Sequence, residues 1–218
     1  MRIGFVLFEN SFERDIALPR QYLSKFQGVE IDLVAPRPSR VELDCGCAVM
    51  PDMAFDDAAD FDILCVPGGS GVVQGLAAPE LLDFLAARAE QAQIVAAVGT
   101  GTFLLGGAGL LVGKSATTHP AYGDLLEEMG GRYVQQDVVA DGNVITASVA
   151  DAAPAFVAAI AERAGLAEAN GAPRLPAALD RQEECACLPS KAEAVYASRV
   201  AEVRTAIETE MPDGQYTF

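Results

Sequence analysis

Basic residues are scarce in this sequence. It has 15 Lys and Arg against 31 Asp and Glu, which gives a net charge of −16 over 218 residues. Such an acidic surface repels phosphate backbones and anionic lipid headgroups, so we expect no nucleic-acid partner and no binding to a membrane surface. No apolar run approaches the roughly 20 residues of a membrane span. The N-terminal MRIGFVLF is too short for a secretion signal and is typical of a first core strand.

The five cysteines are an odd number, which argues against a disulfide scaffold and favours the reducing cytoplasm. Four of them form two Cys-x-Cys pairs, Cys45/Cys47 and Cys185/Cys187. Most metal sites use Cys-x2-Cys spacing instead. A Cys-x-Cys on a strand places both thiols on one face, which leaves a shared ligand or a redox role open. Free cysteine usually packs as a small apolar residue, so we expect both pairs to be structural or incidental and predict no metal site.

Short apolar runs alternate with segments of helical spacing, and 51% of the residues are hydrophobic, enough for one large core. The unbroken apolar runs are typical of strands buried on both faces of a parallel sheet. Strands are predicted at 3–8, 29–35, 61–66, 94–98 and 144–147, and helices at 15–26, 79–92, 102–111, 121–129 and 151–164. This alternation predicts a doubly wound α/β sandwich, to which residues 41–50 add a small β-hairpin arm.

The composition changes after Gly165. Residues 166–189 are rich in Ala, Pro and charge, as in a linker, and a capping box at Ser190 and Glu193 begins a final helix. Apolar residues fall on one stripe of that helix: Tyr196, Val200, Val203 and Ile207. We therefore predict an α/β domain at 1–165 and a C-terminal extension at 166–218. The helix packs on its own domain or on a partner subunit, and a lid over the active site is the alternative.

Three segments place candidate site residues at the carboxyl ends of predicted strands, where open parallel sheets bind ligands. The turn at Gly68 and Gly69 exposes backbone N–H groups to an anion. Residues 99–102, Gly-Thr-Gly-Thr, lead from a strand straight into a helix, and such an elbow usually carries a reactive side chain. The third segment, at 117–120, contains the single histidine, His119. The glycine patterns of dinucleotide and phosphate-loop sites are incomplete, so we expect no nucleotide.

Together these motifs resemble those of the DJ-1/PfpI (ThiJ) superfamily, and most of all its isonitrile hydratase branch, over about residues 1–165. The matching segments are Phe8 through Asp15 to Pro19, the hairpin arm, and residues 66–69, 98–101, 106–111, 116–119 and 141–146. The resemblance implies a flavodoxin-like sandwich that forms a homodimer. It implies a small-molecule pocket built from Asp15, the Gly68/Gly69 turn, the elbow and the segment around His119. In isonitrile hydratases an elbow cysteine attacks the isocyanide carbon, assisted by residues matching Asp15 and Thr100.

This sequence has Gly99 at the place of that cysteine. Glycine cannot be a nucleophile, and it relaxes the strained elbow. A Cys-to-Gly substitution of a hydratase is one alternative explanation. The remaining groups are the Asp15 carboxyl, expected to be partly buried with a raised pKa, the Thr100 hydroxyl, the His119 imidazole and the amides of Gly69 and Thr100. Gly101 completes the expected substrate-binding turn.

This set of groups supports hydration, elimination, isomerisation or cyclisation of a small molecule, with no covalent intermediate and no cofactor. Two other functions stay open: a metabolite-binding protein on a disabled scaffold, and an isonitrile hydratase in which Asp15 activates water. Glyoxalase and protease activities are disfavoured because both depend on the absent thiol. Structural alternatives also remain: Asp15 suits an N-cap or a dipole partner in the first turn of a helix, and Thr100 and Thr102 are residue types that cap helices. In the structural alternative for His119, it is a loop residue with its hydrogen bonds made locally. A further alternative is that Cys185 or Cys187 replaces the missing elbow thiol.

Overall fold

The computed structural model describes residues 1–167. The predicted C-terminal extension, with its helix and the Cys185/Cys187 pair, lies outside these residues. Within them, no helix is both long and apolar enough to cross a membrane. The cytoplasmic location stays a prediction.

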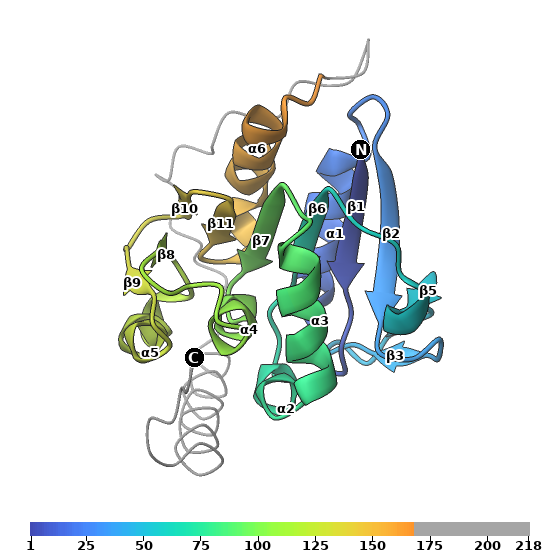
Figure 1. Cartoon of the computed structure of the whole chain (residues 1–218), viewed down its shortest axis with the longest axis horizontal. Coiled ribbons are helices and arrows are strands. Elements are labelled where there is room, and N and C mark those ends of the chain that lie inside the picture. Colours follow the sequence, from blue (N-terminus) through green and yellow to red (C-terminus); the bar gives the residue numbers. More distant parts are fainter. Residues whose placement is uncertain (168–218) are drawn as a thin grey trace.

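A seven-stranded sheet forms the centre of the fold, with the strand order β10-β11-β7-β6-β1-β2-β5 (Figure 1). Its strands are β1 (Arg2–Val6), β2 (Glu30–Ala35), β5 (Met53–Ala54), β6 (Ile63–Val66), β7 (Ile94–Val98), β10 (Val138–Asp141) and β11 (Val144–Ala147). Every pair is parallel except β10 with β11. All residues of β6, β7 and β11 are buried, which explains why β6 and β7 are apolar throughout and β11 is apolar except for Thr146.

Helices cover both faces of this sheet. They are α1 (Glu13–Leu23), α2 (Val72–Leu76), α3 (Pro79–Ala89), α4 (Gly101–Gly107), α5 (Gly123–Glu128) and α6 (Ala153–Ala164). Figure 1 shows α3 and α4 in front of the sheet and α1 and α6 behind it. The side chains form two separate core clusters, and alternate residues of β6, such as Leu64 and Cys65, point into one or the other. The predicted doubly wound α/β sandwich is confirmed.

Short strands complete the fold beside the main sheet. The predicted hairpin arm is present as β3 (Val41–Glu42) and β4 (Ala48–Val49), which pair antiparallel. A second small sheet, β8 (Ser115–Ala116) with β9 (Arg132–Tyr133), is parallel and was not predicted. Single turns of 3-10 helix occur at Phe55–Asp57, Pro120–Tyr122 and Ala150–Ala152.

The hairpin arm removes the packing role, one of the two predicted for the Cys45/Cys47 pair, and leaves the incidental one. Cys45 and Cys47 are exposed, so they do not pack as small apolar residues. Cys65 does so in β6, where burial raises the pKa of its thiol and keeps it protonated and unreactive.

Candidate active site

The elbow at Gly99 lies between the end of β7 and the start of α4. Gly99 has a φ of +55°, in the left-handed region, and its N–H donates to the Ala147 carbonyl over 2.8 Å. A residue with a side chain pays roughly 1–2 kcal/mol for that conformation. Glycine therefore removes the steric cost but keeps the sharp elbow, so the conformation itself is not relaxed.

The space beside Gly99 faces a carboxylate. A Cβ atom placed on Gly99 would lie 3.8 Å from Asp15 Oδ2 and 3.7 Å from the Ser148 carbonyl oxygen. Both are ordinary van der Waals distances, so the surroundings would admit a side chain. The apex of the elbow is thus a small space bordered by Asp15.

Asp15 lies in the first turn of α1 and is 5% exposed. Its Oδ2 accepts a hydrogen bond from the Gly68 N–H over 2.9 Å. Burial raises the pKa of the carboxyl to about 6, against the lowering effect of that bond. Helix α1 has Phe12 at its N-cap, so Asp15 does not cap it.

One oxygen of Asp15 remains for chemistry. Within residues 1–167, every fully buried side-chain oxygen or nitrogen has a hydrogen-bond partner. No bond to Asp15 Oδ1 is found in the same range, so this oxygen keeps some contact with solvent. A carboxylate held by one oxygen and accessible at the other is suited to proton transfer.

The Gly68–Gly69 turn fits against the elbow because it has no side chains. A Cβ on Gly68 would lie 2.9 Å from both Asp15 Oδ2 and Thr100 Oγ1. Gly69 has a φ of +147° and pairs with Ser11, and a Cβ there would lie 2.2 Å from the Asn10 carbonyl oxygen. The two glycines therefore allow the backbone to approach the site residues closely.

Gly69→Ala is expected to destabilise the fold by about 2–4 kcal/mol, because the new methyl group overlaps backbone atoms and the φ is strained. Urea unfolding measures the loss. Gly109→Ala is the matched control, since Gly109 has a φ of +74° but nothing within 4 Å of its Cβ position. Equal losses in the two variants would contradict the close approach at Gly69.

Thr100 binds the glycine turn through its side chain. Its Oγ1 accepts from the Gly69 N–H over 3.0 Å and donates to the Gly69 carbonyl over 3.4 Å. Thr100 occupies the N-cap position of α4, but its side chain makes no cap hydrogen bond there. The Gly69 amide, predicted to bind an oxyanion, is occupied by Thr100. The Thr100 amide, by contrast, has no acceptor in the described part of the chain. The next residue, Gly101, packs so closely against the backbone that a Cβ atom on it would lie 2.4 Å from the Pro67 carbonyl oxygen.

His119 lies on the segment that follows β8. Its Nδ1 accepts the Ala121 N–H over 3.3 Å, its ring packs edge-on against Tyr122, and burial lowers its pKa. The neighbouring Thr118 Oγ1 donates to the Gly99 carbonyl over 2.9 Å. This bond fixes the His119 segment to the elbow.

A group of buried threonines supports this arrangement and was not predicted. Thr102 Oγ1 donates to the Thr117 carbonyl over 3.0 Å, and the Thr117 N–H donates to Thr146 Oγ1 over 2.8 Å. All three are fully buried. The only signal in the sequence is a hydroxyl residue within an otherwise apolar strand, such as Thr146 in β11.

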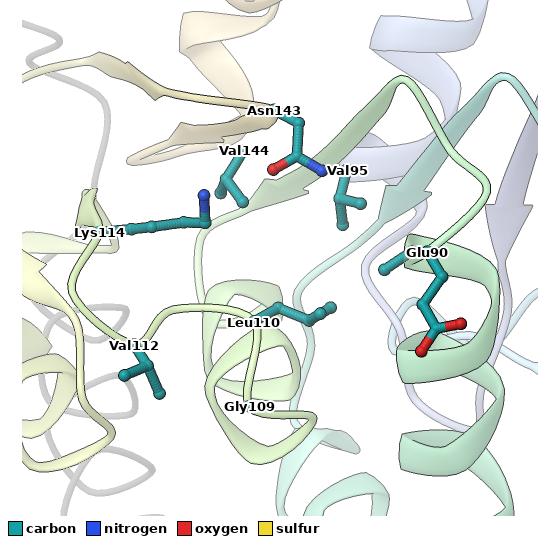
Figure 2. A pocket seen from close by; sticks show the side chains of 9 residues that line it. Glu90, Val95, Gly109, Leu110, Val112, Lys114, Asn143 and Val144 are labelled. Carbon is teal, nitrogen blue, oxygen red and sulfur yellow. The ribbon is translucent and has the colours of Figure 1, made fainter.

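A separate hollow of about 250 Å³ is lined by none of these residues. Figure 2 shows Val95 and Val144 at its back and the Glu90 and Lys114 side chains on opposite sides. Val95 is near the start of β7, whereas Gly99 follows its end. The hollow is therefore at the opposite end of the strands and does not belong to the candidate site.

Comparisons with known proteins agree with the fold and cover the site. Residues 1–163 match the model of the DJ-1/PfpI family. The chain is 40% identical over 146 residues to an isonitrile hydratase of Pseudomonas putida, an alignment covering 67% of this chain and 64% of that protein. It is 29% identical over 119 residues to a glutathione-independent glyoxalase of Caenorhabditis elegans, covering 54% of this chain and 63% of the relative. It thus spans slightly less than two thirds of each relative.

A solved structure of a ThiJ/PfpI family protein from Pseudomonas syringae has the same fold. It superposes with a TM-score of 0.79 at 25% sequence identity, covering 95% of this chain and 89% of that one. The family match includes every site residue described above, from Asp15 to His119. The chain belongs to the DJ-1/PfpI family.

Proposed function

We propose that this protein is a small-molecule lyase or isomerase that works by non-covalent acid/base catalysis without a cofactor. The observation that supports this most is Asp15, a buried carboxyl with a pKa raised to about 6, which borders an elbow apex that has no side chain. The reaction is a hydration, elimination, isomerisation or cyclisation. We also expect the homodimer that the family resemblance implies, which light scattering tests.

Asp15 is the proton carrier in this proposal. A carboxyl with a pKa of about 6 is mostly ionised at pH 7, yet it holds a proton firmly enough to return it to an intermediate. Its Oδ2 stays bound to the Gly68 N–H, so Oδ1 is the oxygen that exchanges the proton.

Thr100 and His119 assist the proton transfer. The Thr100 amide stabilises negative charge that develops on the reactant, as an oxyanion-hole donor does. Because His119 Nδ1 accepts a hydrogen bond and burial disfavours the charged ring, its proton resides on Nε2. We assign His119 a supporting role in the proton transfer, with a ring that is neutral at pH 7 because burial lowers its pKa.

A second candidate is isonitrile hydration, favoured by the 40% identity to a protein of that activity. Here Asp15 removes a proton from water while the water oxygen bonds to the isocyanide carbon. Asp15 then returns this proton to the carbon, and the nitrogen takes up a proton as the new hydroxyl group loses its own, so that an isocyanide and one water give an N-substituted formamide.

Two assays separate these functions. Incubation with cyclohexyl isocyanide, followed by chromatography for the formamide, tests hydration. Incubation of a panel of small carbonyl and hydroxy compounds in D2O, followed by mass spectrometry, tests for a base that exchanges carbon-bound hydrogen. Deuterium uptake or conversion supports the first proposal, and formamide supports the second. Tight binding of a panel compound with neither change would identify a binding protein and overturn both.

The rate is expected to depend on pH through Asp15. Because the ionised form is the base, kcat/KM should fall about tenfold per unit below pH 6 and level off above it. Initial rates between pH 4.5 and 8.5 on the substrate identified above measure the profile. A flat profile over this range would exclude Asp15 as the base.

A further inference from the structure

The tip of the β3–β4 hairpin carries two exposed thiols, Cys45 and Cys47, on either side of Gly46. The tip is a tight turn: the Gly46 N–H donates to the Leu43 carbonyl over 2.9 Å, and the Leu43 N–H donates to the Cys47 carbonyl over 2.8 Å. Gly46 has a φ of +82°, which allows the reversal. The two cysteines are therefore held together by the backbone.

The two sulfur groups interact with each other. The Cys47 N–H lowers the pKa of the Cys45 thiol, but desolvation, the Cys47 thiol and the Glu13 carboxylate raise it, and the net shift is upward. Residues two apart in sequence are at most about 7 Å apart between Cα atoms, and a turn shortens that distance. A disulfide requires Cα atoms about 4.4–6.8 Å apart, a separation that residues two apart in a turn can adopt.

The hairpin tip is fixed to the rim of the candidate active site. The Asp44 N–H donates to the Ser11 carbonyl over 3.1 Å, and Ser70 Oγ donates to Asp44 Oδ1 over 2.8 Å. Ser11 itself pairs with Gly69. Figure 1 shows β3 at the edge of the sheet toward which the arrowheads of β1 and β2 point. The pair thus lies on the side of the sheet that bears the elbow.

We propose that Cys45 and Cys47 form a reversible dithiol–disulfide site that reacts with small disulfides. One thiolate of the pair attacks the external disulfide, whose S–S bond breaks and releases one small thiolate. The second thiolate then attacks the hairpin sulfur of the mixed disulfide, forms the Cys45–Cys47 bond and releases the second small thiolate. The pair loses two electrons, and the external disulfide becomes two thiols. This site does not depend on the reaction proposed for Asp15.

Oxidised glutathione is the probe that tests the site. The full chain is incubated with it, quenched with acid, alkylated with N-ethylmaleimide and cleaved after Asp and Glu. Cleavage after Asp44 and Asp52 releases CGCAVMPD, which holds both thiols and separates them from Cys65. We expect this peptide to lose two hydrogens and its alkylated form to fall by about tenfold or more. The buried Cys65 is the internal control and should keep its thiol.

Two single variants test the order of the steps. Cys45→Ser and Cys47→Ser each leave one thiol, so both should stop as the mixed disulfide with glutathione. Both positions are exposed, so folding should be unaffected. The proposal is overturned if the native peptide keeps two alkylated thiols, carries two glutathiones, or links two chains instead of closing on itself.

Discussion

Asp15→Asn is expected to lower turnover by about 10²–10⁴-fold, the usual contribution of a positioned general base. Asparagine has nearly the same shape, and its side-chain oxygen can still accept the Gly68 N–H that Asp15 Oδ2 binds. The variant therefore removes the proton carrier and keeps the hydrogen bond. Deuterium uptake and formamide formation measure the loss.

The same substitution is expected to raise stability at neutral pH. The folded pKa of Asp15, about 6, lies above its ordinary value of 3.8. The native state therefore binds more protons than the unfolded state between these values, and stability falls as the pH rises from about 4 to about 6. Asparagine does not titrate, so the variant should gain about 3 kcal/mol relative to the native protein above pH 7.

Urea unfolding at pH 4 and pH 8 compares the two proteins, and Asp83→Asn, on the exposed side of α3, is the matched control. The control should change neither turnover nor stability appreciably. The raised pKa would be contradicted if the Asp15→Asn variant lost activity but its gain in stability over the native protein were the same at pH 8 as at pH 4. Undiminished turnover would remove Asp15 from the mechanism.

Gly99→Cys is expected to create a reactive thiol beside Asp15. A Cβ at this position lies 3.8 Å from Asp15 Oδ2 without overlap, and the φ of +55° costs roughly 1–2 kcal/mol of stability. We expect cyclohexyl isocyanide hydration to rise on the order of 10²-fold, well below the roughly 10⁶-fold that removing a nucleophile costs an evolved protease. Iodoacetamide labelling followed by peptide mass spectrometry detects the thiol.

Gly99→Ala is the control for this variant, because it adds the same backbone strain without sulfur. The alanine variant should lose the same stability and gain no activity. Adding Asp15→Asn to the cysteine variant should remove most of the gain, since the thiol would lose its proton acceptor. A folded cysteine variant that is neither labelled nor more active would show that the apex does not accommodate a nucleophile.

The strands and helices with strong patterns were predicted closely. Residues 94–98 and 144–147 are β7 and β11 as predicted, because a short apolar run, broken in β11 only by Thr146, is favourable in a fully buried strand. Helix ends were predicted less well: α1 begins at Glu13 rather than at Asp15. The two-residue strands of the β8–β9 sheet were missed, because so short a segment has no period to detect.

The candidate site was only partly predictable. The glycine turn and the elbow were found because each follows an apolar strand. The buried threonines were missed. The Gly69 amide was wrongly predicted to be free for a ligand, because its hydrogen bond goes to Thr100, 31 residues further along the chain. The exposure of Cys45 and Cys47 was likewise set by the hairpin tip and not by their hydrophobicity.

The layered α/β architecture, the glycine at elbow position 99 and the polar residues proposed for the site all came from the sequence alone. These features depend only on residues that are close together in the sequence: the spacing of the apolar residues, the positions of the glycines and the identity of residue 99. The burial of Asp15 against Gly68, its pKa of about 6 and the bond of Thr100 to the Gly69 amide follow only from the folded structure. Burial and hydrogen-bond partners depend on segments that meet only when parallel strands align their carboxyl ends.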